Sequence, residues 1–294
     1  MKYLITIGAI LISSIVLSQP NNIYTDSVLT TSEFKIGIRY TSDYVYMGRT
    51  DSMAAPYLIP SLAYYHKSGF FIRGYFSYLT AKDQNRIDLY GFEGGYEYTG
   101  EKLLLGTSLS QYIFSDASYV VQAEMNTFAN VYAGYDLNVL VVFADVGLGL
   151  SDNTDVFATV DASRTFYTLK NKLLIMPSFT IQAGTQKYYD QYYQYRSPQS
   201  GFGRDGGGNG NGPGGSPQPR PEVSILESDK FQVLNYETSI QLTYKLNSFR
   251  FFVIGNWVFP VKPATVVIND QTEKEKLNNT FYFTTGVRLS IPTR

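Results

Sequence analysis

The stretch FYFTTGVRLSI, residues 281 to 291, alternates between two chemically different faces. Successive side chains of an extended strand point to opposite sides, so Phe281, Phe283, Val287 and Leu289 share one face and Arg288 lies on the other. In a soluble β-sandwich the apolar face would form the core. In a membrane barrel the apolar face contacts lipid and the arginine points into the lumen. We expect the second arrangement, because the rest of the sequence favours it.

The composition favours a membrane barrel over a membrane helix or a disulfide-rich fold. The 294 residues include 26 tyrosines and 19 phenylalanines but no cysteine, and only 17% are charged. Beyond the N-terminal segment no apolar run approaches the roughly 18 residues that a spanning helix needs. Abundant aromatic residues with few charges are typical of outer-membrane barrels. The formal net charge of −1 gives no electrostatic reason to expect nucleic acid as a partner.

The N-terminus has the features of an export signal. Lys2 supplies a positive charge, residues 4–17 are mainly apolar, and Ser18 is small enough for cleavage before Gln19. We predict a signal peptide at 1–18, a periplasmic segment at 19–33 and a barrel at 34–294. The predicted location is the outer membrane of a Gram-negative bacterium. The expected partners are outer-membrane lipid, lipopolysaccharide and the barrel assembly machinery.

Alternating apolar and polar residues recur along the chain in twelve segments. These segments are 34–44, 55–66, 69–79, 87–99, 102–114, 118–134, 138–150, 156–168, 173–185, 230–245, 249–261 and 279–291. Such alternation predicts β-strands, and single-chain bacterial barrels have an even number of them. The predicted fold is therefore all-β, a single antiparallel transmembrane β-barrel of about twelve strands.

The connections between these segments alternate in length. The short ones are 67–69, 99–101, 136–137, 169–172 and 246–248, and the longer ones include 47–54, 80–86, 186–229 and 262–278. Short periplasmic turns and longer external loops are the expected asymmetry of an outer-membrane barrel. A secreted β-sandwich, the alternative fold, has no reason to sort its loops in this way. The Gly/Pro-rich tract 197–222 is predicted to be a disordered external loop.

Two stretches resemble a largely uncharacterised family of bacterial outer-membrane barrels. Its members carry a Ser-Asp-Tyr-aromatic-Arg-Gly type segment soon after the signal peptide. Residues 42–48, SDYVYMG, are similar, with Met47 where the family usually has arginine and Arg49 close behind. The stretch PSFTIQAGTQKYY, residues 177–189, also resembles the family. The resemblance implies the barrel fold and the outer membrane, and it implies no known substrate or reaction.

Catalytic and metal-binding patterns are sparse. The single histidine, His66, lies beside the short turn at 67–69, whereas a lipid-acting barrel enzyme would need a serine and a base on the external side. The histidine, aspartate and glutamate residues are not spaced like a metal site. We therefore predict no enzymatic activity, no cofactor and no metal, and a barrel enzyme acting on lipid is the weakest alternative.

Inward-facing charges are predicted to separate into two arcs around the lumen. The basic arc consists of Lys35, Arg39, Arg73, Arg250 and Arg288, and the acidic arc consists of Glu93, Glu97, Glu124, Asp145, Asp161 and Glu237. Opposed arcs across a narrow passage would orient polar solutes and tune ion selectivity. The predicted function is a narrow porin-like diffusion channel for small polar solutes. In the alternative, these residues pair and plug the lumen, and the closed barrel has a structural or surface-interaction role.

Overall fold

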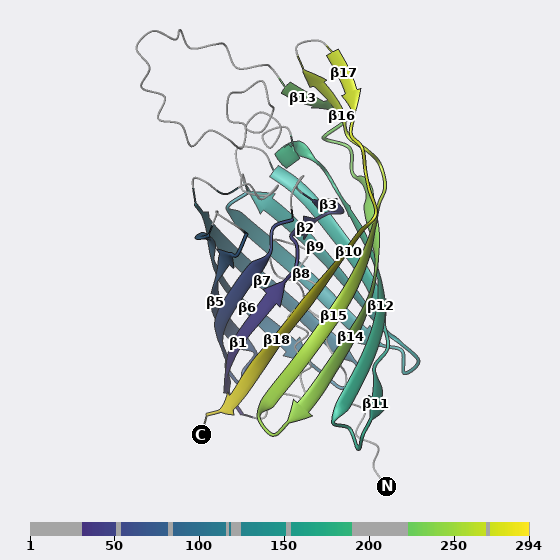
Figure 1. Ribbon diagram of the computed structural model, residues 1–294. Coiled ribbons are helices and arrows are strands. Elements are labelled where there is room, and N and C mark those ends of the chain that lie inside the picture. The colour runs from purple at the N-terminus through teal and green to yellow at the C-terminus, as the bar shows by residue number, and fades with distance from the viewer. Residues whose placement is uncertain are drawn as a thin grey trace, which may run out of the picture.

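A computed structural model describes residues 31–50, 54–81, 85–115, 118, 125–150, 154–189, 223–268 and 271–293. Within these residues, twelve long antiparallel strands form a closed barrel (Figure 1). They are β1 (Glu33–Thr41), β4 (Tyr57–Tyr65), β5 (Phe70–Leu79), β6 (Arg86–Thr99), β7 (Leu103–Phe114), β8 (Thr127–Asp136), β9 (Val141–Leu150), β10 (Thr154–Ser163), β12 (Leu173–Gly184), β14 (Gln232–Leu246), β15 (Phe249–Pro260) and β18 (Thr280–Pro292). The predicted fold class is confirmed.

Each strand of the barrel pairs with its neighbour along the chain, and the first and last strands close it. β1 pairs with β18 over its whole length, from Glu33 opposite Pro292 to Thr41 opposite Thr284. Because this register is continuous, residues from the two ends of the sequence lie side by side in the barrel wall. The short connections gather at one end of the barrel, which we call the turn end, and the longer ones gather at the loop end (Figure 1).

The outer surface of the barrel is apolar. Phe281 and Phe283 on β18 are exposed, whereas Tyr282 and Thr284 between them are buried inside. Val287 and Leu289 are only half-buried rather than fully exposed. They stand opposite Phe251 and Phe249 of β15, whose exposed rings share the outer face. No helix among the described residues is both long and apolar enough to cross a membrane.

Some strand boundaries differ from the prediction. Within the segment predicted at 118–134, residues 119–124 lie outside the described residues and β8 begins at Thr127. Asn138 has a positive φ of 66° in the turn that precedes β9. The segment predicted at 156–168 is interrupted after Ser163 and resumes as β11 (Phe166–Thr168). Aromatic and β-branched residues continue through these turns, so alternation alone does not mark where pairing stops.

Three predicted long loops contain structure that the sequence pattern did not reveal. A small hairpin, β2 (Val45–Tyr46) and β3 (Arg49–Thr50), starts just before the first of them, 47–54, and ends inside it. The other two contribute β13 (Val223–Leu226), β16 (Thr265–Ile268) and β17 (Gln271–Lys274), which form a separate three-stranded sheet at the loop end (Figure 1). The predicted signal peptide at 1–18, most of the segment at 19–33, Glu124 and the tract 197–222 lie outside the described residues.

Candidate functional site

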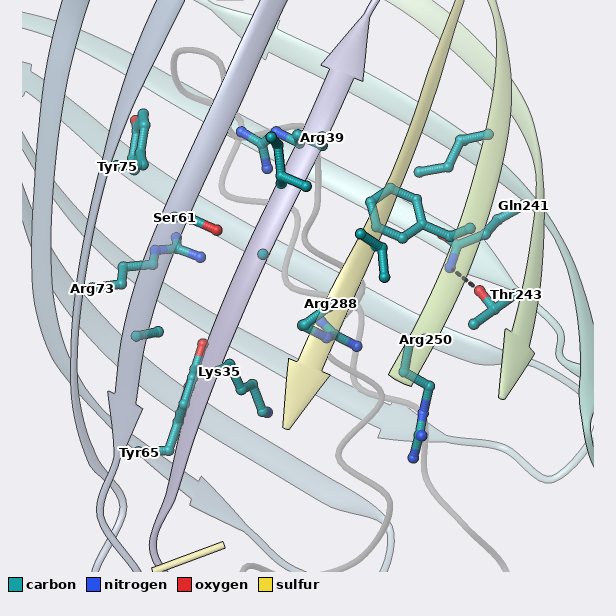
Figure 2. Close-up of a pocket in the computed structure, with 16 residues that line it drawn as sticks. Lys35, Arg39, Ser61, Tyr65, Arg73, Tyr75, Gln241, Thr243, Arg250 and Arg288 are labelled. Carbon is teal, nitrogen blue, oxygen red and sulfur yellow. Dashed lines mark hydrogen bonds between the residues drawn. The ribbon is translucent and has the colours of Figure 1, made fainter. Parts of the chain in front are cut away.

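One half of the barrel wall encloses a basic cavity. Its lining comes from six neighbouring strands, β14, β15, β18, β1, β4 and β5, and the cavity is open to solvent on one side. All five residues of the predicted basic arc line it, and Figure 2 shows their side chains on these strands. They are Lys35, Arg39, Arg73, Arg250 and Arg288.

Strand register brings three of the positive charges into one row. Arg288 on β18 stands opposite Arg250 on β15, and Arg250 stands opposite Lys245 on β14. Side chains directly opposite on antiparallel strands have Cβ atoms only about 4.5–5.5 Å apart, and like charges there are destabilising. On the other side of Arg288 lies Gly37 of β1. A Cβ at Gly37 would lie 3.0 Å from the Ser61 hydroxyl, so glycine leaves this part of the cavity clear.

Polar and aromatic side chains complete the lining of the cavity. Tyr65, Tyr75 and Ser61 lie on the β4 and β5 side, and Gln241 and Thr243 lie on β14. The Gln241 amide donates to the Thr243 hydroxyl at 2.8 Å, the dashed line in Figure 2. The alternation that predicted the basic arc also places these residues on the inner face. Because these side chains carry no charge, the charge pattern of the sequence does not indicate them.

Two members of the basic arc form ion pairs with acidic side chains. Arg73 on β5 forms an ion pair with Glu93 on the neighbouring β6, and both side chains are buried. The ammonium of Lys35 lies 2.8 Å from a carboxylate oxygen of Glu33 near the turn end, and 4.2 Å from the centre of the Tyr65 ring. No aspartate or glutamate is among the residues that line the cavity itself.

Of the other predicted acidic residues that the structure describes, Glu97, Asp145 and Asp161 lie on strands outside the cavity wall, whereas Glu237 lies on β14, which also lines the cavity. Glu97 on β6 accepts a hydrogen bond from the Tyr132 hydroxyl at 3.3 Å. Asp161 on β10 is fully buried and accepts from Thr180 at 2.8 Å, and Asp145 on β9 is also buried. On β14, Glu237 stands opposite the same Thr180 of β12 and accepts from Tyr282 at 3.5 Å. None of these acids is among the residues that line the cavity, but Glu97 is near enough to Lys35 and Arg73 to attract both electrostatically.

The β2–β3 hairpin is folded into the loop end of the barrel. The Tyr44 ring, just before it, lies 6.3 Å from Tyr57 of β4, and the Tyr46 ring lies 6.0 Å from Phe157 of β10. On another side, a Cβ added to Gly48 would come within 2.7 Å of Asn235 of β14. One short hairpin thus contacts strands from well-separated parts of the ring, which places it within the lumen.

An aromatic cluster surrounds the hairpin. Tyr46, Met47, Phe128, Phe157 and Tyr188 belong to one buried apolar core that also includes residues of β4, β5, β6, β7 and β14. Burial, together with the neighbouring Tyr188 and Tyr44 hydroxyls, raises the pKa of Tyr46 well above its ordinary value, so this ring is neutral. The segment that carried the family resemblance, residues 42–48, thus fills much of the loop end.

A buried ion pair ties the hairpin to the loops above it. Arg49 donates to Glu275 at 3.1 Å and to the Lys262 carbonyl at 3.2 Å. The Arg49 side chain is 1% exposed and the Glu275 side chain is 9% exposed. Its guanidinium lies 4.8 Å from the centre of the Tyr189 ring, whose hydroxyl donates to the same Glu275. The family resemblance includes the position of Arg49, but no sequence pattern indicates its partner Glu275, 226 residues away.

Replacing Arg49 with methionine is expected to release the hairpin. The substitution leaves Glu275 without its charged partner, and breaking a buried ion pair in this way typically costs about 3–5 kcal/mol. Hydrogen exchange of the residue 45–50 amides should accelerate strongly. The exposed pair Lys230–Glu227 is the control, because its side chains are 59% and 61% exposed and Lys230→Met should change little. Unchanged exchange in Arg49→Met would show that the aromatic cluster alone holds the hairpin.

The single histidine lies in the turn between β4 and β5. Its Nδ1 is 2.6 Å from the Ser68 hydroxyl, and it also accepts from the Ser68 backbone N–H at 3.2 Å, with both side chains exposed. These contacts between residues two apart close the local turn. Within the described ranges, no three histidine, aspartate or glutamate side chains are grouped closely enough to hold a metal ion.

No family model matches the chain, and no curated protein matches it. Among solved structures, the chain is similar to a KdgM porin, with 11% identity over 87% of this chain and 99% of that one and a TM-score of 0.47. It is also similar to a NanC porin, with 10% identity over 87% of this chain and 98% of that one and a TM-score of 0.46. For LpxR from Salmonella typhimurium the identity is 11%, over 87% of this chain and 99% of that one, with a TM-score of 0.41. With identities of at most 11% and TM-scores of at most 0.47, the function is inferred from this chain's own residues.

Proposed function

We propose that this protein is an outer-membrane barrel that acts as a narrow, porin-like diffusion channel for small polar solutes. The observation that carries the proposal is the charged cavity inside a closed barrel whose outer face is apolar. A barrel that served only as a membrane anchor would have no need for five cationic side chains around an open interior space. On this proposal the signal peptide at 1–18 directs export, the turn end faces the periplasm and the loop end faces the medium.

Charge separation inside the barrel supports passage of polar rather than apolar solutes. The basic cavity occupies β14 through β5, whereas Glu97, Asp145 and Asp161 lie on β6, β9 and β10. Charges fixed on opposite walls of a narrow, low-dielectric passage create a field across it, and such fields orient dipolar solutes and select among ions. Twelve strands fall between the filled interior of eight-stranded barrels and the open channel of sixteen-stranded porins.

A closed barrel with a structural or surface-interaction role is the second candidate. The observation that favours it is the hairpin with its aromatic cluster, which occupies the loop end. Conductance of the purified protein in a planar bilayer separates the two functions. Stable ion-conducting steps support the channel, and a folded, inserted protein that passes no current supports the closed barrel.

Arg288→Glu is expected to shift the selectivity of the channel toward cations, because it reverses a charge in the cavity lining. The reversal potential across a potassium chloride gradient should show the shift. The effect should be weaker in concentrated salt, since the Debye length falls from about 10 Å at 0.1 M to about 3 Å at 1 M. The control is Lys230→Glu, which makes the same change of charge at an exposed position outside the barrel strands. Equal shifts in both variants would mean that ions do not pass beside Arg288.

A further inference from the structure

We propose that the basic cavity is a binding site for small oxyanions, such as organic carboxylates or phosphates, that enter the barrel. This inference deepens the proposed channel function, because it names the class of solute that the passage would hold. The site comprises Lys35, Arg39, Arg73, Arg250 and Arg288, and the group is called the oxyanion site below.

The first argument is the balance of charge. Five cationic side chains line the cavity, and no carboxylate lines it. Glu93 and Glu33 form ion pairs with Arg73 and Lys35, and Glu97 attracts the same two cations electrostatically. The positive charge therefore outweighs the negative charge along this half of the wall. A solute with negative charge would lower its electrostatic energy on entering, whereas a cation would be repelled.

The second argument is the alignment of the cations. Lys245, Arg250 and Arg288 are direct cross-strand partners on three consecutive strands. Like charges at such positions repel each other. A barrel could spread these charges around its wall, but here strand register concentrates them. The Arg250 guanidinium also donates to the backbone carbonyls of Asn247 and Phe249 at 3.1 and 3.4 Å, and an anion bound beside Arg288 would offset the repulsion within the row.

The third argument is the type and placement of the donors. Arginine presents a planar fork of N–H groups that matches the two oxygens of a carboxylate or phosphate. The hydroxyls of Tyr75, Ser61 and Thr243 and the amide of Gln241 face the same cavity and add neutral hydrogen-bonding groups (Figure 2). The register pairs Gly37 with Arg288 and Gly286 with Arg39. The missing side chains let the Ser61 hydroxyl and the Phe252 ring approach these two positions closely.

Binding can be measured without relying on conduction. The full-length purified protein, folded in detergent, would be titrated calorimetrically with citrate, with inorganic phosphate and with the uncharged sugar sucrose. We expect citrate or phosphate to bind at 10 mM salt, with affinity falling at least tenfold in 1 M salt, and sucrose not to bind. The two anions also distinguish a carboxylate from a phosphate preference. Anion binding that equals sucrose binding, or that does not respond to salt, would overturn the proposal.

Variants locate the binding to the oxyanion site. Arg250→Gln with Arg288→Gln should weaken anion binding at least tenfold, while Lys230→Gln, an exposed control, should leave it unchanged. If the double glutamine variant does not fold, Arg250→Lys with Arg288→Lys keeps the charge and removes the planar fork, and a smaller loss is expected. Full affinity in both folded double variants would refute the assignment.

Failure of the channel and failure of the oxyanion site give different results. If the protein binds citrate but passes no current, the oxyanion site is supported and the channel function is contradicted. If the protein conducts ions but binds neither citrate nor phosphate, the channel function is supported and the oxyanion site is contradicted.

Discussion

Val131→Arg is expected to prevent efficient insertion of the barrel or to destabilise it strongly. Val131 lies in the middle of β8, points outward and is 58% exposed on the apolar outer face. A cationic side chain on the lipid face near the membrane midplane costs about 2–4 kcal/mol, because its charge leaves water. Urea unfolding of the protein in lipid vesicles, compared with the wild type, would measure this loss.

Val139→Arg is the matched control for that substitution. Val139 is the same residue type and is 59% exposed, but it lies in the short turn between β8 and β9. Near the membrane interface the same cation costs only about 0–1 kcal/mol. The two variants therefore differ in depth and hardly at all in chemistry or exposure. Equal losses at the two positions, or none at Val131, would show that this face does not contact lipid.

Replacing residues 45–50 with a flexible Gly/Ser segment of equal length is expected to raise the ion conductance several-fold. The hairpin occupies the loop end together with the aromatic cluster, so removing Tyr46, Met47 and Arg49 should widen the passage there. The barrel itself should survive the change, because β2 and β3 pair only with each other and not with the barrel sheet. Single-channel recording would measure the increase.

Tyr46→Phe is the control for the hairpin replacement. It keeps the ring between Phe157 and Tyr188 and removes only a buried hydroxyl that has no hydrogen-bond partner among the described residues. Its conductance should match the wild type. If the Gly/Ser variant also matched the wild type, the narrowest point would lie elsewhere. The second apolar cluster inside the barrel, where the rings of Tyr65 and Phe71 and those of Tyr132 and Phe143 stack, would be the next place to test.

Much of the candidate site could be predicted because a barrel strand has a strict period of two. Once Phe34 and Ile36 are assigned to the outside, Lys35 and Arg39 must point inward. The closure of β1 against β18 then brings Arg39 and Arg288 close together although 249 positions separate them in the sequence, as their shared neighbour Gly286 shows. Closure is required of any membrane barrel, because an open edge would leave backbone groups without partners in lipid. The cavity and its polar lining were not predictable, since they depend on how far each side chain reaches.

The sequence by itself determined the strand number, the antiparallel order, the apolar outer face and the side of each strand that carries charge. These properties follow from local alternation and from the need to satisfy every backbone group within the barrel. Only the tertiary structure decided that the hairpin turns inward, that Arg49 meets Glu275, and that Arg250 stands opposite Arg288. The direction of a loop, an ion pair between distant loops and the register between strands are set by packing of residues far apart in the sequence. No local pattern encodes such contacts, so the shape of the passage emerges only when the barrel closes.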